Sequence, residues 1–432
     1  MNKPQNFSKK SFAIYGLGLT GKSVIKFLKK QSVSNYVAWD DLKKNRDQFK
    51  KKNISNFFLK SLNTVDYIII SPGIDIKKTK FKKIILKNKH KIITDLDLFY
   101  LLNKKCKTVV VTGTNGKSTT CKLLEHVLKK NKINVKLGGN IGKPILSLNI
   151  NKKTIVIIEA SSFQLHYSKF IKPKYAMILN ITKDHLDWHG SMQNYLNSKL
   201  KIFLFQDKND YAFLADKNLI NKFNNRNSSS KLKVVNIFLS NKIKKQIINR
   251  YLKSKSNEKN ISFVYKFCQV LKIKENLIIK SLNTFQGLPH RHEIFYKFKN
   301  FTFINDSKAT SFEASKFALE SNSNIFWIVG GLPKLGDQFF LKKLKGNIIK
   351  SYIIGKNISF FKKQLKNKIN YTTAKNLKKA ISLIFVELKK NQNKKINILL
   401  SPASASYDQY KNFNERGNEF KKLIKTYVQK YF

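Results

Sequence analysis

A glycine-rich loop between a predicted strand and a predicted helix carries the clearest chemistry in the sequence. It consists of Gly113-Thr114-Asn115-Gly116-Lys117-Ser118-Thr119 and follows the apolar stretch Thr108–Thr112. Backbone N–H groups of such a loop can surround nucleotide phosphates, Lys117 can neutralise their charge, and the Ser118 hydroxyl can reach Mg²⁺. The common phosphate-loop pattern has glycine where this chain has Val111. The sequence therefore predicts a variant nucleoside triphosphate site.

Acidic and imidazole side chains follow two other predicted strands. Glu159 comes directly after the stretch Ile155–Ile158, and Asp184-His185 comes soon after Tyr175–Leu179. Open α/β folds bind ligands at the carboxyl ends of their strands, so these side chains can lie near the phosphate loop. Carboxylate oxygens suit Mg²⁺, the ion that accompanies a nucleoside triphosphate. We expect a Mg²⁺ site here, although any one of these residues alone could serve an ordinary surface or capping role.

A second glycine turn, Gly16-Leu17-Gly18-Leu19-Thr20-Gly21, follows a predicted strand and matches the pattern G-x-G-x-x-G. Asp40 ends the next predicted strand. The glycines let the backbone approach a diphosphate at a helix N-terminus, and the acid can accept a hydrogen bond from another part of the ligand. Taken alone, the turn would suggest a nicotinamide dinucleotide. A tight turn without a ligand is the other interpretation.

Three further segments rich in small and polar residues occur in the last third of the chain. They are Gly287–Glu293, which contains His290-Arg291, and the segments Asn305–Thr310 and Ser401–Gln409. The last two each follow a predicted strand, at the edge where open α/β sheets bind their ligands. All three are therefore candidate ligand-binding loops.

Strands alternate with helical stretches along the chain, which favours parallel sheets and an α/β fold. We expect three α/β domains, at residues 1–95, 96–297 and 298–432: a Rossmann-like N-terminal domain, a central phosphate-loop domain and a Rossmann-like C-terminal domain. Strands are predicted near residues 11–15, 36–39, 67–70, 91–93, 108–112, 155–158, 175–179, 301–304, 325–329, 351–354 and 396–400, and an amphipathic helix at 415–430. The Asn-, Lys- and Ser-rich stretch 222–260 gives no clear prediction.

The formal net charge of +60 suggests at first a partner rich in phosphate. The basic residues are spread along the whole chain, however, and only five of the 85 are arginine, the residue that reads phosphates and bases best. Compositional drift explains this better than a functional polycation, so no specific nucleic acid is expected. No apolar run of 18 residues predicts a membrane span, and three scattered cysteines fit a reducing cytoplasm.

The ordered set of motifs resembles the Mur ligases over nearly the whole chain. The phosphate loop, Glu159, Asp184-His185, His290-Arg291 and Asn305–Thr310 carry this resemblance. Three features are similar to the D-glutamate-adding branch of the family, namely the first glycine turn, the turn Ser71-Pro72-Gly73-Ile74 and the C-terminal run Ser401–Phe413. Another Mur-type ligase or a folylpolyglutamate synthetase stays a near alternative. An NAD-dependent oxidoreductase would leave the phosphate loop without a role.

The resemblance implies a monomeric cytoplasmic enzyme that uses ATP and Mg²⁺, with two ions expected, to join D-glutamate to UDP-N-acetylmuramoyl-L-alanine. It implies that the N-terminal domain binds the UDP-sugar, the central domain ATP and the C-terminal domain the amino acid. The implied UDP-sugar contacts are Leu19, Thr20, Asp40, Gly73, Asn140 and Ser161. The implied phosphate and metal residues are Lys117, Ser118, Glu159 and His185, with Arg291 and Asp306 contacting the nucleotide. The implied D-glutamate contacts are Thr310, Lys334, Ser406 and Phe413.

One lysine has a special place in this resemblance. Lys199 falls where the family carries a lysine carbamylated by CO₂, which converts a cation into an oxygen ligand for Mg²⁺. Relatives also often have His-Asn-x-x-Asn at a helix lining the ATP site. We align that pattern with Lys259–Phe263, so that Phe263 replaces the second asparagine. Relatives have Asp-Gly-Lys before the lysine that corresponds to Lys334, where this chain has Leu332-Pro333-Lys334.

Overall fold

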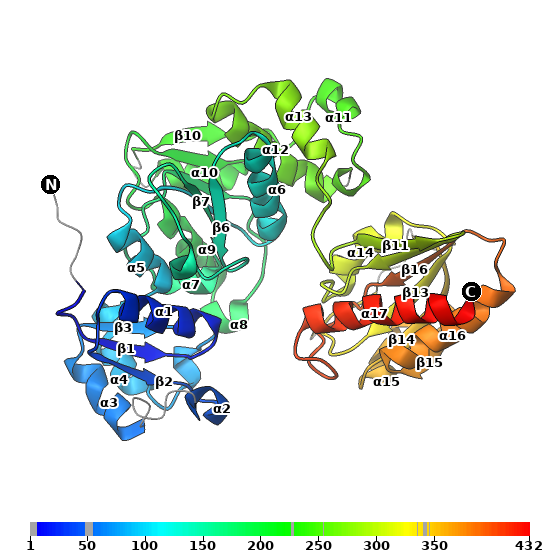
Figure 1. Ribbon diagram of the computed structural model, residues 1–432, viewed down its shortest axis with the longest axis horizontal. Helices are drawn as coiled ribbons and strands as arrows, with labels where there is room; N and C mark the ends of the chain where they lie inside the picture. Colours follow the sequence, from blue (N-terminus) through cyan, green and yellow to red (C-terminus); the bar gives the residue numbers. More distant parts are fainter. Residues whose placement is uncertain are drawn as a thin grey trace. The chain divides into compact units, whose positions relative to one another are not determined.

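The computed structural model describes residues 7–47, 55–225, 229–253, 255–334, 336–339, 344 and 346–432. They form two compact units, Met1–Phe285 and Gln286–Phe432. The first unit contains two β-sheets and the second contains one (Figure 1). The fold is thus α/β and built on three sheets, as the sequence predicted.

The first sheet is parallel, in the order β2-β1-β3-β4. Its strands are β1 (Phe12–Tyr15), β2 (Tyr36–Trp39), β3 (Tyr67–Ile70) and β4 (Ile92–Ile93), and its helices are α1 (Leu19–Lys30), α2 (Lys43–Arg46), α3 (Ser55–Thr64) and α4 (Lys82–Lys87). Successive strand side chains point to opposite faces. Phe12 and Ile14 therefore pack with α1, whereas Ala13 and Tyr15 pack with α3 and α4.

The second sheet is also parallel, in the order β10-β9-β8-β5-β7-β6. Its strands are β5 (Lys107–Thr112), β6 (Val135–Gly139), β7 (Ile155–Glu159), β8 (Tyr175–Ile178), β9 (Tyr211–Leu214) and β10 (Lys231–Val234). Helices α6 (Lys117–Lys130), α12 (Lys255–Val270) and α13 (Glu275–Asn283) cover one face. Helices α5 (Asp95–Leu102), α7 (Ser162–Tyr167), α9 (Met192–Leu200) and α10 (Lys217–Asn224) cover the other. Both faces are buried, which is why Val109–Val111 of β5, Ile155–Ile158 of β7 and all of β8 are apolar.

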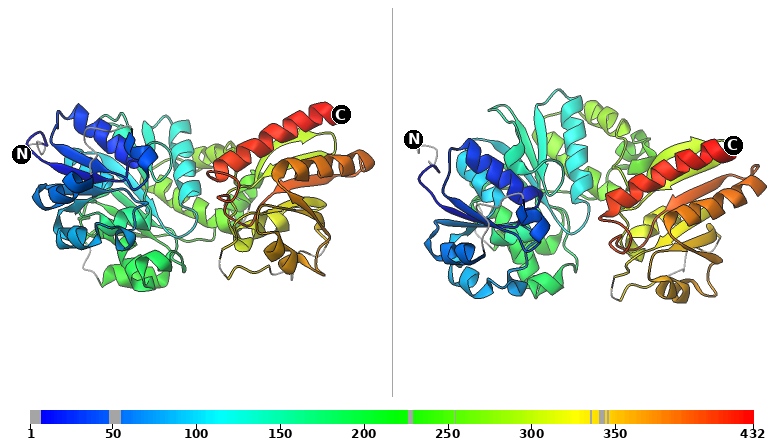
Figure 2. Two further views of the ribbon diagram at one scale, coloured as in Figure 1. Left: turned by 90° about the horizontal axis from the view of Figure 1, so that it is seen from below. Right: turned by 60° about the horizontal axis from the view of Figure 1, so that its bottom comes forward.

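The third sheet has the order β11-β12-β16-β13-β14-β15, and only the β11–β12 pair is antiparallel. Its strands are β11 (Glu293–Phe298), β12 (Phe301–Asn305), β13 (Ile325–Gly330), β14 (Ile348–Ile354), β15 (Tyr371–Lys375) and β16 (Ile396–Leu400). Helices α16 (Leu377–Lys390) and α17 (Phe413–Tyr431) lie side by side on one face (Figure 2). Helices α14 (Phe312–Glu320) and α15 (Ile358–Leu365) pack on the other.

The strands that sequence inspection did not find are β6, β9, β10, β11 and β15. Most of them carry lysine or glycine among few apolar residues, and β10, β11 and β15 lie at sheet edges, where one side needs no partner strand. Strand β11 begins at Glu293, inside the range assigned to the central domain, and the two units divide after Phe285. The three-domain boundaries stay a prediction.

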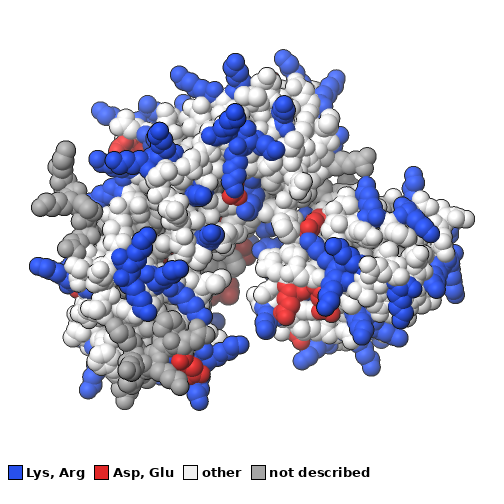
Figure 3. Space-filling model, in the orientation of Figure 1, with Lys and Arg blue, Asp and Glu red and all other residues white. Residues whose placement is uncertain are grey.

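Lysine and arginine side chains are scattered over the face of the molecule seen in Figure 3, above helices and loops of both units. This dispersal matches their spread along the sequence. Within the described residues, no helix is both long and apolar enough to cross a membrane.

Candidate functional site

Three of the predicted motifs follow neighbouring strands of the second sheet. They are the phosphate loop after β5, Glu159 at the end of β7 and the segment after β8. Strands β8, β5 and β7 are neighbours in that order, and Val111 of β5 pairs with both Met177 and Glu159. The three motifs therefore share one edge of the sheet. This is the arrangement expected for the carboxyl ends of parallel strands.

The phosphate loop is fastened to the segment that follows β8. Asn180 exchanges hydrogen bonds with Asn115, accepting from its backbone N–H at 2.9 Å and donating to its carbonyl oxygen at 3.0 Å. The backbone N–H of Thr114 donates to the Asn180 carbonyl at 3.0 Å. The Thr114 hydroxyl accepts from the Thr182 N–H at 3.0 Å and lies 2.9 Å from the Tyr195 hydroxyl. These bonds hold the loop in shape, so its N–H groups are preorganised for an anion.

Lys117 starts helix α6 and lies back over the loop. Its ammonium donates to the carbonyl oxygens of Gly113 at 2.9 Å and Thr114 at 2.7 Å. Gly116 precedes it with φ +84°, a left-handed conformation that favours glycine. A Cβ added at Gly116 would come within 2.2 Å of Asn260 Oδ1. The loop thus needs glycine for two reasons, its backbone conformation and the close approach of Asn260.

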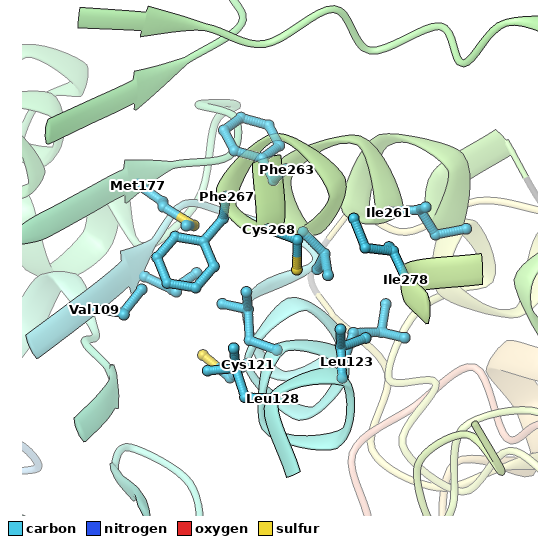
Figure 4. Packing of buried hydrophobic residues seen from close by; sticks show 14 of the residues in the cluster. Val109, Cys121, Leu123, Leu128, Met177, Ile261, Phe263, Phe267, Cys268 and Ile278 are labelled. Carbon is cyan, nitrogen blue, oxygen red and sulfur yellow. The ribbon is translucent and has the colours of Figure 1, made fainter. Parts of the chain in front are cut away.

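Asn257 and Asn260 form an Asn-x-x-Asn pair beside the phosphate loop, whereas our placement of that pattern on Lys259–Phe263 stays a prediction. Asn260 Nδ2 donates to Asn257 Oδ1 at 3.3 Å, and the Thr120 hydroxyl of α6 donates to Asn260 Oδ1 at 3.3 Å. Both asparagines are buried, one turn apart on α12 and facing the phosphate loop. Phe263 packs in the apolar cluster near Phe267 and Met177 (Figure 4). These contacts favour Asn257 and Asn260, rather than Phe263, as the residues of this helix that line the loop.

Asn260→Ala is expected to raise the KM for ATP about tenfold, because it removes the acceptor of the Thr120 hydroxyl and the donor to Asn257 Oδ1, and frees the loop at Gly116. Phe263→Leu is the matched control one turn along the same helix. It should lower the free energy of unfolding by about 1 kcal/mol through a core cavity and leave that KM unchanged. Steady-state kinetics and urea unfolding measure the two effects. A larger change in KM from the Phe263 variant would support our first alignment instead.

Glu159 is buried at the end of β7, and only one of its two carboxylate oxygens accepts a hydrogen bond among the described residues. Its Oε1 accepts from Asn140 Nδ2 at 2.7 Å, while its buried Oε2 has no hydrogen-bond partner in the structure. A buried carboxylate oxygen without a donor is costly unless a cation faces it. Asn140 also donates its backbone N–H to the Glu159 carbonyl at 2.8 Å. A residue expected to hold Mg²⁺ and a residue expected to contact the UDP-sugar are thus in direct contact.

Lys199 lies against the other side of the phosphate loop. Its side chain is 1% exposed, and its Nζ donates to the Gly113 carbonyl at 2.9 Å and the Thr112 hydroxyl at 3.3 Å. Burial, together with the nearby charge of Lys117, lowers the pKa of Lys199 to about 7, against the pull of Asp184 and Glu159. The amine is therefore neutral in a large fraction of molecules near neutral pH, the form that can react with CO₂.

His185 occupies a left-handed backbone conformation, with φ 53°, before the one-turn helix α8 (Leu186–His189). Its ring packs against Phe163 at 4.7 Å between centroids, and its Nε2 lies 3.4 Å from Asp184 Oδ2. Burial lowers the pKa of His185, which favours the neutral ring that can bind a metal.

Oxygen donors that suit Mg²⁺ lie beside the phosphate loop, where nucleotide phosphates and water would complete the coordination. Among the described residues, no group of three or more His, Cys, Asp or Glu side chains is placed to hold a metal ion. The open Oε2 of Glu159 and the buried Ser118 are oxygen donors beside the loop. A carbamate on Lys199 would add the oxygens that Mg²⁺ prefers.

The first glycine turn is held by Asp40 as well as by its glycines. Asp40 Oδ2 accepts from the Leu17 N–H at 2.6 Å, and Oδ1 accepts from the Leu42 N–H at 2.9 Å. A Cβ at Gly21 would lie 1.9 Å from the Gly16 carbonyl oxygen, so helix α1 passes close to the turn. Leu19 is 81% exposed at the start of α1, beside this turn. Asp40 therefore shapes the turn, a role that sequence inspection assigned only to glycine.

Of the other residues expected to contact the UDP-sugar, Thr20 lies in the first turn of α1, and Gly73 and Ser161 follow β3 and β7. Ser71 closes a turn with Ile74, and its hydroxyl donates to the Gly16 carbonyl at 2.9 Å, while Gly73 is exposed at the tip. Ser161 caps helix α7 by accepting from the Gln164 N–H at 3.2 Å. The Ser161 hydroxyl thus serves as the N-terminal cap of α7.

In the second unit, Asp306 joins three of the candidate loops. Its carboxylate accepts from the Ser401 hydroxyl at 2.7 Å and from the His292 N–H at 3.0 Å. Burial raises the pKa of Asp306 to about 7, although these hydrogen bonds and Arg291 oppose the shift. Arg291, which follows His290 with φ 62°, therefore lies in a loop anchored to the end of β12.

A buried arginine connects the segments expected to bind the amino acid. Arg416 donates to the Ser307 hydroxyl at 3.0 Å, to the Ser307 carbonyl at 2.8 Å and to the Ser404 carbonyl at 3.0 Å. The Ser307 hydroxyl donates in turn to the carbonyl of Phe413 at 2.9 Å. The segments containing Thr310, Ser406 and Phe413 are thereby drawn together.

Lys334 belongs to the same group of loops by its backbone. Leu332 and Ala405 exchange two backbone hydrogen bonds of 2.9 Å, which places the Gly330–Lys334 turn beside Ser406. The Lys334 side chain itself is exposed, and Ser406 is buried. The segment Leu332–Lys334, whose sequence differs from that of relatives, is thus held at Leu332 by hydrogen bonds to Ala405.

Comparison with known proteins agrees with this arrangement. Residues 10–93 match the MurD-like N-terminal domain of Mur ligases, and residues 111–281 match the Mur ligase middle domain. The UDP-N-acetylmuramoylalanine–D-glutamate ligase of Rickettsia bellii is 34% identical, covering 97% of this chain and 98% of its own. The ligase of the same name from Zymomonas mobilis is 30% identical, covering 97% and 98%. The chain belongs to the Mur ligase family.

Solved structures share the fold of this Mur ligase. UDP-N-acetylmuramate-alanine ligase MurC from Thermotoga maritima has a TM-score of 0.57 at 17% identity, covering 96% of this chain and 99% of that one. MurF ligase from Thermotoga maritima, solved in complex with ADP, has a TM-score of 0.55 at 17% identity, covering 87% and 92%.

Sequence inspection gave no role to several residues that shape the site of this Mur ligase. Asn180 and Tyr195 fix the phosphate loop, Asn257 supports Asn260, and Arg416 joins the C-terminal loops. Two signals were present in the sequence. Asn257 and Asn260 have the spacing of one helical turn, and Arg416 is a rare arginine in a chain that otherwise uses lysine.

Proposed function

We propose that the chain joins D-glutamate to the L-alanyl carboxylate of UDP-N-acetylmuramoyl-L-alanine at the expense of ATP. One structural observation carries the ATP-dependent part, namely the phosphate loop with Lys117, Glu159 and a buried Lys199 at adjacent strand ends. The substrate assignment is supported by relatives with that name, which match almost the whole chain. The monomeric state and the cytoplasmic location stay predictions.

The proposed reaction has two steps. The substrate carboxylate attacks the γ-phosphorus of ATP, which gives an acyl-phosphate and ADP. The amine of D-glutamate then attacks the carbonyl carbon, loses a proton, and the phosphate leaves with one of the original carboxylate oxygens. The phosphate loop holds the nucleotide, and Lys117 faces the charge that develops on the transferred group. Arg291 would add a second positive charge near the nucleotide.

Mg²⁺ fits the edge of the second sheet in this proposal, where it would neutralise phosphate charge. Ser118, Glu159, His185 and Lys199 are the residues that would hold it, with Lys199 as its carbamate. Carbamylation joins the neutral amine to the carbon of CO₂ and releases a proton. The lowered pKa of Lys199 makes that neutral amine available near pH 7.

The amino acid would bind in the second unit, where Thr310, Lys334, Ser406 and Phe413 lie on connected loops. Lys334 supplies a positive charge for a carboxylate, and the loops supply small polar groups. The UDP-sugar would lie along Leu19, Thr20, Gly73 and Asn140. Asp40, with both oxygens already accepting backbone N–H groups, would orient the turn for the diphosphate end.

Phosphate release with a panel of amino acids and acceptors tests this assignment. We expect release only when UDP-N-acetylmuramoyl-L-alanine and D-glutamate are both present. L-Glutamate is the matched control, because it has the same charge and the opposite configuration. Faster release with L-alanine, L-lysine or meso-diaminopimelate and their own acceptors would move the chain to another branch of the family.

A further inference from the structure

The segment that carries His185 has a backbone conformation that is unfavourable in isolation. It consists of His185 with φ 53°, the four-residue helix α8 and Gly190 with φ 79°. A left-handed conformation is unfavourable for a residue with a side chain, because its Cβ crowds the backbone. A single turn of helix is also unstable in isolation, because its nucleation is unfavourable. The position of His185 therefore depends on contacts made from outside the segment.

One of these contacts comes from the first sheet. Lys77 Nζ donates to the carbonyl oxygen of Trp188, the third residue of α8, at 3.0 Å. The same ammonium lies 3.8 Å from the place where a Cβ of Gly190 would be. A lysine at the last carbonyls of a helix is favourable both as a donor and as a charge. The other polar anchors of α8 come from the second sheet's own helices, from Asn194 at 3.1 Å and Ser162 at 3.0 Å.

Lys77 is closely connected to the turn expected to bind the UDP-sugar. It belongs to the short 3₁₀ helix η2 (Ile76–Lys78), and its N–H donates to Asp75 Oδ1 at 3.0 Å. The turn Ser71–Ile74 directly precedes Asp75 and is tied to the first glycine turn through Ser71 and Gly16. A ligand that orders this turn therefore restricts Lys77 as well.

An aromatic contact supports the same connection. Tyr167 packs against the core of the first sheet and also against Trp188, with ring centroids 5.8 Å apart. Trp188 further meets His166 edge-on at 5.1 Å. Helix α8 thus contacts aromatic side chains that also pack against the core of the first sheet. Lys77 adds a hydrogen bond to α8 from the first sheet's side.

We propose that Lys77 is a positioning residue that couples the UDP-sugar turn to the His185 segment, so that the bound UDP-sugar strengthens binding of Mg²⁺ and nucleotide. The inference rests on the proposed function. Coupling between two sites is reciprocal, so nucleotide would strengthen UDP-sugar binding by the same factor. The hydrogen bond is exposed, so we expect a coupling at the low end of the usual range, about fivefold.

Calorimetric titration of the full chain tests this coupling. A non-hydrolysable ATP analogue with Mg²⁺ is titrated with and without saturating UDP-N-acetylmuramoyl-L-alanine. For the unmodified protein we expect about fivefold tighter binding when the UDP-sugar is present. For Lys77→Ala we expect less than a twofold difference, with the affinity for each ligand alone changed by less than about twofold. Lys77→Arg should restore the coupling, because it keeps the donor and the charge.

Lys78→Ala is the matched control, since Lys78 is the next residue and pairs with Asp75 at 3.7 Å on the surface. It should keep the full coupling. Equal coupling in the Lys77→Ala variant and the unmodified protein would overturn the inference, as would equal losses in the Lys77 and Lys78 variants. Binding of both ligands without coupling in the unmodified protein would overturn the inference alone. Failure to bind the UDP-sugar at all would overturn the proposed function as well.

Discussion

Lys117→Ala is expected to lower kcat by about 10³-fold or more while leaving the fold intact. Lys117 lies over the phosphate loop, and its removal takes away the positive charge that faces the transferred phosphoryl group. Lys117 is only partly buried, and the Gly113 carbonyl keeps Lys199 as a donor when Lys117 is removed, so the cost in folding stability should be small. Single-turnover phosphate release and thermal unfolding measure the two quantities.

Lys122→Ala is the control for Lys117 on the same helix. Lys122 forms a surface ion pair with Glu125 at 2.9 Å, and such pairs contribute little. It should leave kcat within about twofold of the unmodified value. Normal turnover in the Lys117 variant, with unchanged nucleotide affinity, would remove the phosphate loop from the mechanism.

Lys199→Ala is expected to lose most activity, about 10²-fold or more, and to regain part of it with added acetate or formate. The substitution removes a buried side chain beside Gly113 and leaves space in which a short carboxylate can replace the carbamate oxygens. The unmodified enzyme should lose activity when CO₂ and bicarbonate are stripped. At limiting CO₂ that activity should rise as the pH increases through about 7, because only the deprotonated amine reacts.

The control for Lys199 must be a lysine that is exposed. Lys217 at the start of α10 is suitable, and Lys217→Ala should change nothing measurable. Lys201 is unsuitable, although it is only two residues away, because its ammonium donates to the carbonyls of His166 and Ser168. A mild loss in the Lys199 variant without rescue by carboxylates would identify Lys199 as a structural residue.

The fold was predictable where strands are buried on both faces. Stretches such as Val109–Val111 and Ile155–Ile158 are apolar because helices cover both sides of the sheet. Strand β10, with lysine at alternate positions on a sheet edge, gives no such signal. The many lysine and asparagine residues of this chain obscure the apolar periodicity of helices in the same way, as in the stretch 222–260.

The candidate site was predictable to the level of motifs and not to the level of contacts. The phosphate loop follows from local spacing, whereas the choice between Asn257 and Phe263 depends on which face of α12 meets Gly116. The Lys77–Trp188 contact joins residues 111 positions apart, and no local pattern marks it. Contacts of this kind form when separate elements pack together. They cannot be recognised from residue spacing in a single sequence.

The fate of the substrate's carboxylate oxygens tests the central claim, ATP-driven ligation through an acyl-phosphate. UDP-N-acetylmuramoyl-L-alanine labelled with ¹⁸O in its carboxylate is incubated with ATP, Mg²⁺ and D-glutamate, and the products are weighed by mass spectrometry. We predict one ¹⁸O in each released inorganic phosphate and one ¹⁸O kept in the new amide. Release of phosphate that carries no ¹⁸O, together with formation of the amide, would contradict the account.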